Sequence, residues 1–107
     1  MTSQEQYNNV INSLKLMAAT FDEQKKVLPE FSDVPDDVTS SFENSFLLLP
    51  QLIEQGKFSN YSIALLLRTY NKMQWCLRNT DLDNFSNEEW NKLRMFARHT
   101  LATIVGP

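Results

Sequence analysis

The chain has 107 residues, of which 42% are hydrophobic and 21% are charged, and its formal net charge is −3. This length and balance predict one folded domain, residues 1–107, and exclude the weakly hydrophobic, highly charged composition of disordered chains. Two glycines and four prolines are too few for the many turns of an all-β protein, so the composition favours an all-α fold.

The first twelve residues, MTSQEQYNNVIN, lack the cationic start and apolar stretch of a signal peptide. The longest apolar run, Phe46 to Leu49, has four residues, whereas a membrane span needs about 20. Cys76 is the single cysteine and cannot form an internal disulfide. We expect a cytoplasmic protein with no membrane partner.

The first predicted helix covers about residues 3–28, where apolar residues recur at spacings of three and four. Ser3 and Gln6 have the spacing of a capping box at its start. Pro29 disfavours the α conformation at Leu28 and so ends the helix. A short linker, residues 29–34, follows.

The second predicted helix covers residues 35–55, beginning with Pro35 and ending before Gly56, a natural left-handed cap. Pro50 removes one backbone hydrogen bond in its interior, so the helix must kink there, or break and restart. Leucines outside its main apolar stripe indicate contacts on several sides. We expect this helix to be the central element.

A third helix is predicted over residues 60–78 and a polar loop over residues 79–85. Ser86 and Glu89 have capping-box spacing, which predicts a fourth helix from there to Gly106. The expected fold is a single-domain, all-α bundle of about four helices, with the second helix kinked at Pro50.

Residues that carry chemistry are scarce. The single histidine, His99, and Cys76 could form a nucleophilic pair only by meeting across two helices, and a lone cysteine on a helix is usually a core residue. One Cys and one His cannot assemble a zinc site. There is no glycine-rich phosphate loop or other catalytic motif. We expect no enzymatic activity, no catalytic residue, no metal and no cofactor, although an enzyme using two carboxylates stays open.

Negative charge is concentrated in one segment. Between Lys26 and Lys57 the chain has no Lys or Arg but six acids, namely Glu30, Asp33, Asp36, Asp37, Glu43 and Glu54. Such a segment can steer a cationic partner, so we predict that these six residues bind a protein. The alternative is that helix starts attract carboxylates for local reasons. Direct binding of nucleic acid is disfavoured, because phosphate requires a basic face.

Trp75 lies on the third predicted helix, away from its apolar stripe and on the side of Arg68 and Lys72. Tryptophan between cations can anchor an interface. Burial against another helix is the interpretation that we favour for Trp75.

Three stretches, FDEQKKVLPEF, VPDDVTSSFENSFLLLPQLIEQG and EEWNKLRMFARHTL, resemble the small helical immunity proteins of bacterial contact-dependent growth inhibition systems. The similarity covers roughly residues 20–56 and 88–101. It implies a cytosolic inhibitor that binds the C-terminal toxin domain delivered by a neighbouring cell. Those toxins are commonly nucleases, frequently acting on tRNA.

The resemblance agrees with the charge pattern, because an acidic surface can occupy a cationic nuclease cleft in place of phosphates. We therefore expect an immunity protein that binds its toxin domain through the six acids. A phage-encoded inhibitor or an adaptor subunit of a larger complex is the alternative. The oligomeric state does not follow from the sequence.

Overall fold

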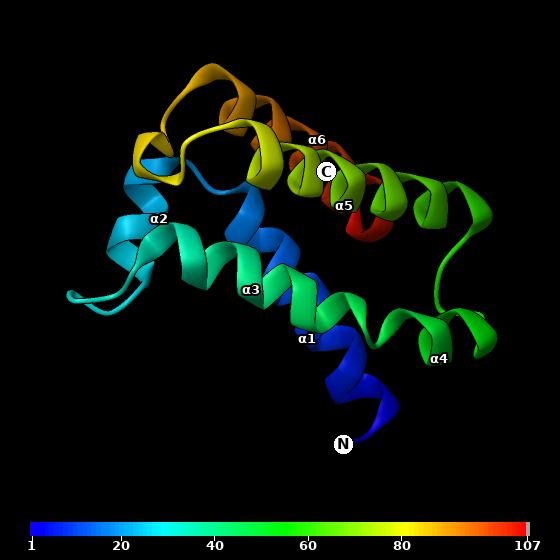
Figure 1. Ribbon diagram of the computed structural model, residues 1–107. Coiled ribbons are helices and arrows are strands. Elements are labelled where there is room, and N and C mark those ends of the chain that lie inside the picture. The colour runs from blue at the N-terminus through cyan, green and yellow to red at the C-terminus, as the bar shows by residue number, and fades with distance from the viewer. Residues whose placement is uncertain (107) are drawn as a thin grey trace.

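The computed structural model describes residues 1–106 and is all-helical, as the composition predicts (Figure 1). The helices are α1 (Ser3–Ala18), α2 (Phe21–Val27), α3 (Val34–Phe46), α4 (Leu49–Glu54), α5 (Asn60–Asn79) and α6 (Glu88–Val105), with a 3₁₀ turn, η1 (Leu82–Asn84). The prediction of about four helices is wrong, because residues 1–106 form six α-helices. The first two predicted helices are each divided.

The first division separates α1 from α2 at Ala19 and Thr20. The Thr20 side chain accepts a hydrogen bond from the Glu23 backbone N–H, and the Glu23 carboxylate accepts one from the Thr20 N–H. This capping box supplies partners for two backbone donors that a helix start leaves free, so a second helix can begin here. Thr20 and Glu23 have the required spacing in the sequence, but the continuous apolar pattern obscures it.

The second division lies before Pro50. Leu47 and Leu48 donate backbone hydrogen bonds to residues three positions back, and α4 then begins at Leu49. Pro50 thereby occupies the first turn of α4, where a backbone N–H needs no helical partner. The expected kink at Pro50 is therefore a break two residues upstream, and Figure 1 shows α3 and α4 as successive segments.

The helix ends differ from the predicted ones by about one residue. Thr2 and Glu5 form the capping box of α1, in place of Ser3 and Gln6. Asn87 caps α6 in place of Ser86, by accepting from the Trp90 N–H. The prediction for Gly56 is confirmed: its φ is 73°, and it donates to the Ile53 carbonyl in a left-handed cap of α4.

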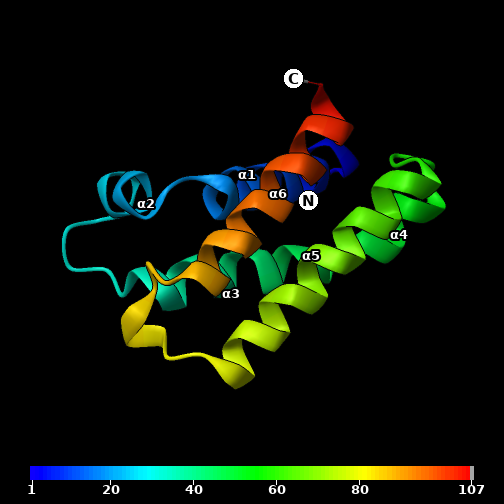
Figure 2. The same cartoon turned by 90° about the horizontal axis from the view of Figure 1, so that it is seen from above.

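The long helices pack in layers. α1 contacts both α3 and α6, and α6 in turn contacts α5 (Figure 2). α3 also contacts α2 and α5, and the rings of Phe46 and Tyr70 stack with their centroids 4.0 Å apart. The second predicted helix is nevertheless not the central element, because α1 and α6 make the most extensive contacts with other helices.

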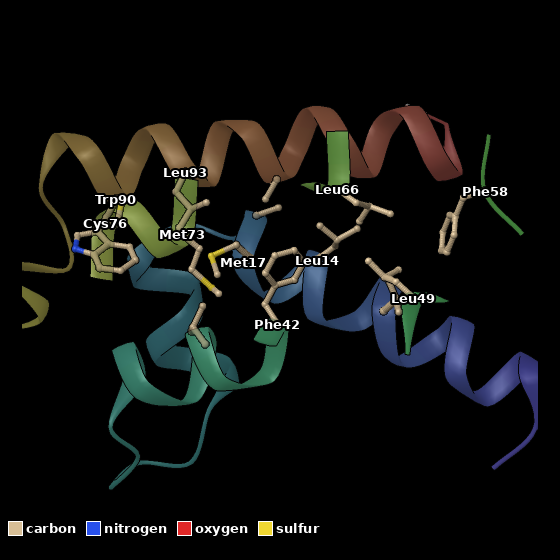
Figure 3. Packing of buried hydrophobic residues seen from close by; sticks show 14 of the residues in the cluster. Leu14, Met17, Phe42, Leu49, Phe58, Leu66, Met73, Cys76, Trp90 and Leu93 are labelled. Atoms are coloured by element: carbon tan, nitrogen blue, oxygen red, sulfur yellow. The ribbon is translucent and has the colours of Figure 1, made fainter. Parts of the chain in front are cut away.

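One hydrophobic core joins the helices, which supports a single domain. Leu14 and Met17 of α1 meet Phe42 of α3, and Met73 and Leu93 approach them from α5 and α6 (Figure 3). Burial of such side chains stabilises a fold by roughly 1.5–3 kcal/mol each. Among residues 1–106, no helix combines the length and apolar character needed to cross a membrane.

A buried arginine fastens α2 to α6. Arg94 is 3% exposed, and its guanidinium donates to the side-chain oxygens of Gln24, at 3.0 Å, and Asn91, at 2.9 Å. The guanidinium carbon lies 4.6 Å from the centre of the Phe85 ring. Burial, together with nearby Arg98, lowers the pKa of Arg94 to about 10. None of these contacts supplies a carboxylate, so the cation depends on neutral amide oxygens.

Replacing Gln24 with leucine tests this arrangement. Gln24→Leu removes an acceptor from a buried cation, which we expect to lower the free energy of unfolding by about 2 kcal/mol. The additional change Arg94→Met removes the buried charge that has lost its acceptor, and should recover part of the lost free energy of unfolding. Urea unfolding of the single and double variants measures both effects. Strictly additive losses would contradict the coupling.

Candidate protein-binding surface

Five of the six predicted binding residues are close together in the fold. Glu30 and Asp33 lie in the α2–α3 loop, Asp36 and Asp37 in the first turn of α3, and Glu43 two turns further along. Asp36 and Glu43 are exposed on the side of α3 opposite the buried Val38 and Phe42.

The sixth predicted residue is separate. Glu54 lies at the end of α4, whereas the other five carboxylates begin in the α2–α3 loop, at the opposite end of the α3–α4 layer (Figure 1). A single small contact centred on that loop would not reach Glu54. We therefore omit it from the candidate surface.

The carboxylates of this region have no basic partner. Within residues 1–106, the ion pairs are Lys25–Asp22, Lys72–Glu89 and Lys92 with Glu88 and Glu89, all on α2, α5 or α6. Asp33 accepts a hydrogen bond from the Asp36 N–H at 3.3 Å and so caps α3. Asp33 therefore has a structural role, whereas Glu30 and Glu43 make no ion pair in the described chain and face solvent.

Two exposed apolar side chains accompany the carboxylates. Phe31, between Glu30 and Asp33, is 96% exposed, and Leu47 follows Glu43 by one turn. Apolar anchors surrounded by polar residues are typical of protein interfaces. We define the acidic surface as Glu30, Phe31, Asp33, Asp36, Asp37, Glu43 and Leu47.

Phe31 and Leu47 are not among the binding residues predicted from the charge pattern. Phe31 could have been recognised as an aromatic residue isolated in a proline-flanked acidic linker. Leu47 could have been recognised too, because it falls outside the main apolar stripe and follows the exposed Glu43 by one helical turn.

The possible nucleophilic pair is not formed. The Cys76 thiol is buried, which raises its pKa, and it lies 3.6 Å from the Glu89 carbonyl oxygen. His99 is ten residues beyond Glu89 on α6, about 15 Å along the helix, and is exposed beside Tyr61. In residues 1–106 no three His, Cys, Asp or Glu side chains gather as metal ligands.

Trp75 is at the surface, contrary to the favoured interpretation of burial. It is 41% exposed, and the Lys72 ammonium lies 4.3 Å from its ring centroid. Lys72 also pairs with Glu89 at 2.6 Å. Hydrogen bonds from Lys72 and Lys92 lower the pKa of Glu89. This group of charges belongs to the α5–α6 layer and is separate from the acidic surface.

Comparison of the chain with family models, curated proteins and solved structures finds no match.

Stability measurements can separate structural from binding carboxylates. Asp33→Ala removes the cap of α3 and should lower the free energy of unfolding by about 1 kcal/mol. Glu43→Ala changes an exposed, unpaired residue and should alter it by less than about 0.5 kcal/mol. Urea unfolding at neutral pH gives both values. Equal losses would show that Glu43 also contributes to folding.

Proposed function

We propose that this protein is a non-catalytic inhibitor, an immunity protein that binds and neutralises a bacterial toxin domain through its acidic surface. The main support is the set of five carboxylates in the α2–α3 loop and along α3, which have no ion-pair partner within residues 1–106 and include, beside the exposed Phe31, Glu30 and Asp33. Asp33, Asp36 and Asp37 stabilise the start of α3, but Glu30 and Glu43 have no such local role, and the grouped carboxylates repel one another. A cationic partner would offset that repulsion.

A nuclease is the kind of toxin that this surface suits best. Enzymes that cleave RNA bind phosphates through Lys and Arg side chains, and carboxylates attract the same cations. We propose a tRNA-cleaving ribonuclease as the partner. Phe31 and Leu47 would add apolar contact to this charge matching, which mainly governs association rate and specificity.

Neutralising two acids tests the role of charge. Asp36→Asn with Glu43→Gln keeps side-chain shape, and should slow association with the toxin domain encoded beside this gene by about tenfold at low salt. The matched control, Asp83→Asn with Glu88→Gln, changes the net charge equally but lies outside the acidic surface. Stopped-flow kinetics at several salt concentrations measure the effect.

Two results would overturn the proposal. The first is that cells producing the unaltered protein are still killed by the neighbouring toxin. The second is that the acidic-surface variant and the control variant associate with the toxin domain at equal rates. Net charge alone would then explain any slowing, and the acidic surface would have no specific role.

Phe31 tests the apolar part of the surface. Because Phe31 is almost fully exposed, Phe31→Ala should leave the free energy of unfolding unchanged within about 0.5 kcal/mol. If it is an anchor, the same change should weaken toxin binding by about 2 kcal/mol, or roughly thirtyfold. Calorimetric titration measures the affinity. An unchanged affinity would remove Phe31 from the interface.

A further inference from the structure

A groove lies beside the acidic surface, between α1 and α3. Its volume is about 550 Å³. The two helices run in opposite directions along it, as two side-chain hydrogen bonds show: Ser13 contacts Ser45 near the middle, and Gln6 of α1 contacts Gln51 of α4 at one end. Leu16 and Leu48 supply apolar walls.

The polar lining of the groove consists of amides and hydroxyls. Its members are Asn9, Asn12, Ser13, Ser41, Asn44 and Ser45, and no Lys, Arg, Asp or Glu is among the lining residues. Asn12 and Asn44 are exposed on facing helices. Each side-chain amide has a carbonyl oxygen that can accept hydrogen bonds from a ligand and an NH2 group that can donate them.

The two buried serines have too few hydrogens for their contacts. The Ser13 hydroxyl lies 2.8 Å from the Val10 carbonyl oxygen, the Ser45 hydroxyl lies 3.0 Å from that of Phe42, and the two hydroxyl oxygens are 2.6 Å apart. Two hydroxyl hydrogens cannot fill three hydrogen bonds. The pair therefore has oxygen lone pairs to spare but no spare hydrogen, which favours a ligand that donates.

Carboxylates stand near both ends of the groove. Glu5 precedes Asn9 by one turn of α1, and Asp37 precedes Ser41 by one turn of α3, so each continues a row of lining residues. Because the helices are antiparallel, the two carboxylates lie at opposite ends. Glu5 also accepts a hydrogen bond from the Thr2 N–H, so Asp37 is the carboxylate that is free to attract a cation with an apolar stem to the groove.

We propose that the α1–α3 groove binds an arginine side chain from a basic segment of the partner, an inference that rests on the proposed function. The aliphatic stem lies against Leu16 and Leu48. The planar guanidinium has five N–H donors and can donate hydrogen bonds to acceptors on both helices at once. The lysine ammonium is compact and strongly hydrated, so it is less suited to this arrangement.

The test uses a small probe and needs no toxin. The ¹⁵N-labelled full chain is titrated with N-acetyl-arginine methylamide and, separately, with its neutral isostere N-acetyl-citrulline methylamide. We expect saturable amide shifts at Asn12, Ser13, Asn44 and Ser45, with millimolar affinity that is at least about fivefold weaker for citrulline. Equal affinities, or arginine shifts confined to the α2–α3 loop, would overturn the inference.

A pair of variants ties the shifts to the groove. Asn44→Leu removes an exposed acceptor from the lining and should abolish saturation by the arginine probe. Asn71→Leu makes the same change at an exposed position of α5, outside the groove, and should leave the titration unaltered. Equal binding by the two variants would contradict the assignment, provided that both unfold in urea as the unaltered chain does.

Co-expression separates failure of this inference from failure of the proposed function. If the neighbouring toxin is neutralised but arginine does not bind in the groove, the groove assignment alone is wrong. If arginine binds in the groove but the toxin still kills, the immunity function is wrong, and so is the assignment of the partner segment to that toxin. Protection weakened by Asn44→Leu but not by Asn71→Leu supports both.

Discussion

The contact between Arg94 and Gln24 determines how α2 lies on the rest of the fold. Gln24 accepts from the Arg94 guanidinium and donates to the Leu16 carbonyl at 2.9 Å, so one side chain links α2 to both α6 and α1. The α2–α3 loop, which carries Glu30 and Phe31, begins only a few residues later. The position of Glu30 and Phe31, the loop part of the acidic surface, thus depends on a polar contact inside the core.

Burying the Arg94 guanidinium in this contact costs free energy, although the contact also orients α2. A guanidinium loses much of its hydration on burial, and neutral oxygens compensate only in part, which explains why the pKa of Arg94 falls to about 10. Stacking on Phe85 recovers some attraction. Apolar residues could fill the same space, but they would hold α2 with less directional preference. We infer that the arginine contributes more to the orientation of α2 than to stability.

How far the sequence predicts the fold depends on whether a feature is local. Spacing of apolar residues predicts α5 within about one residue, and Gly56 predicts its left-handed cap, because both follow from neighbouring residues. The division at Thr20 also follows from neighbouring residues. It was missed because the apolar spacing across residues 3–28 predicts one continuous helix, whereas the Thr20–Glu23 capping box predicts a new helix start. The burial of Arg94 was not predictable, since it requires Gln24 from 70 positions away in the sequence.

The candidate surface likewise has features that follow from local sequence and features that depend on how the helices pack. The acidic segment was recognised from composition, and five of its six members lie together because a loop and one helix carry them. Glu54 is separate because α3 and α4 follow one another and place it at the far end of that pair of helices. The groove was not predictable, because Ser13 and Ser45 belong to different helices that only the packing of α1 against α3 brings together.

The acidic surface and the groove would contribute different parts of recognition. Exposed carboxylates act over about 10 Å at ordinary salt, so they accelerate the approach of any cationic protein and discriminate little among them. The groove acts only at contact, where amide and hydroxyl oxygens must match the donors of one side chain. An inhibitor that must bind one toxin quickly and reject other basic proteins needs both. In that arrangement Asp37 belongs to each, since it adds to the acidic surface and stands at one end of the groove.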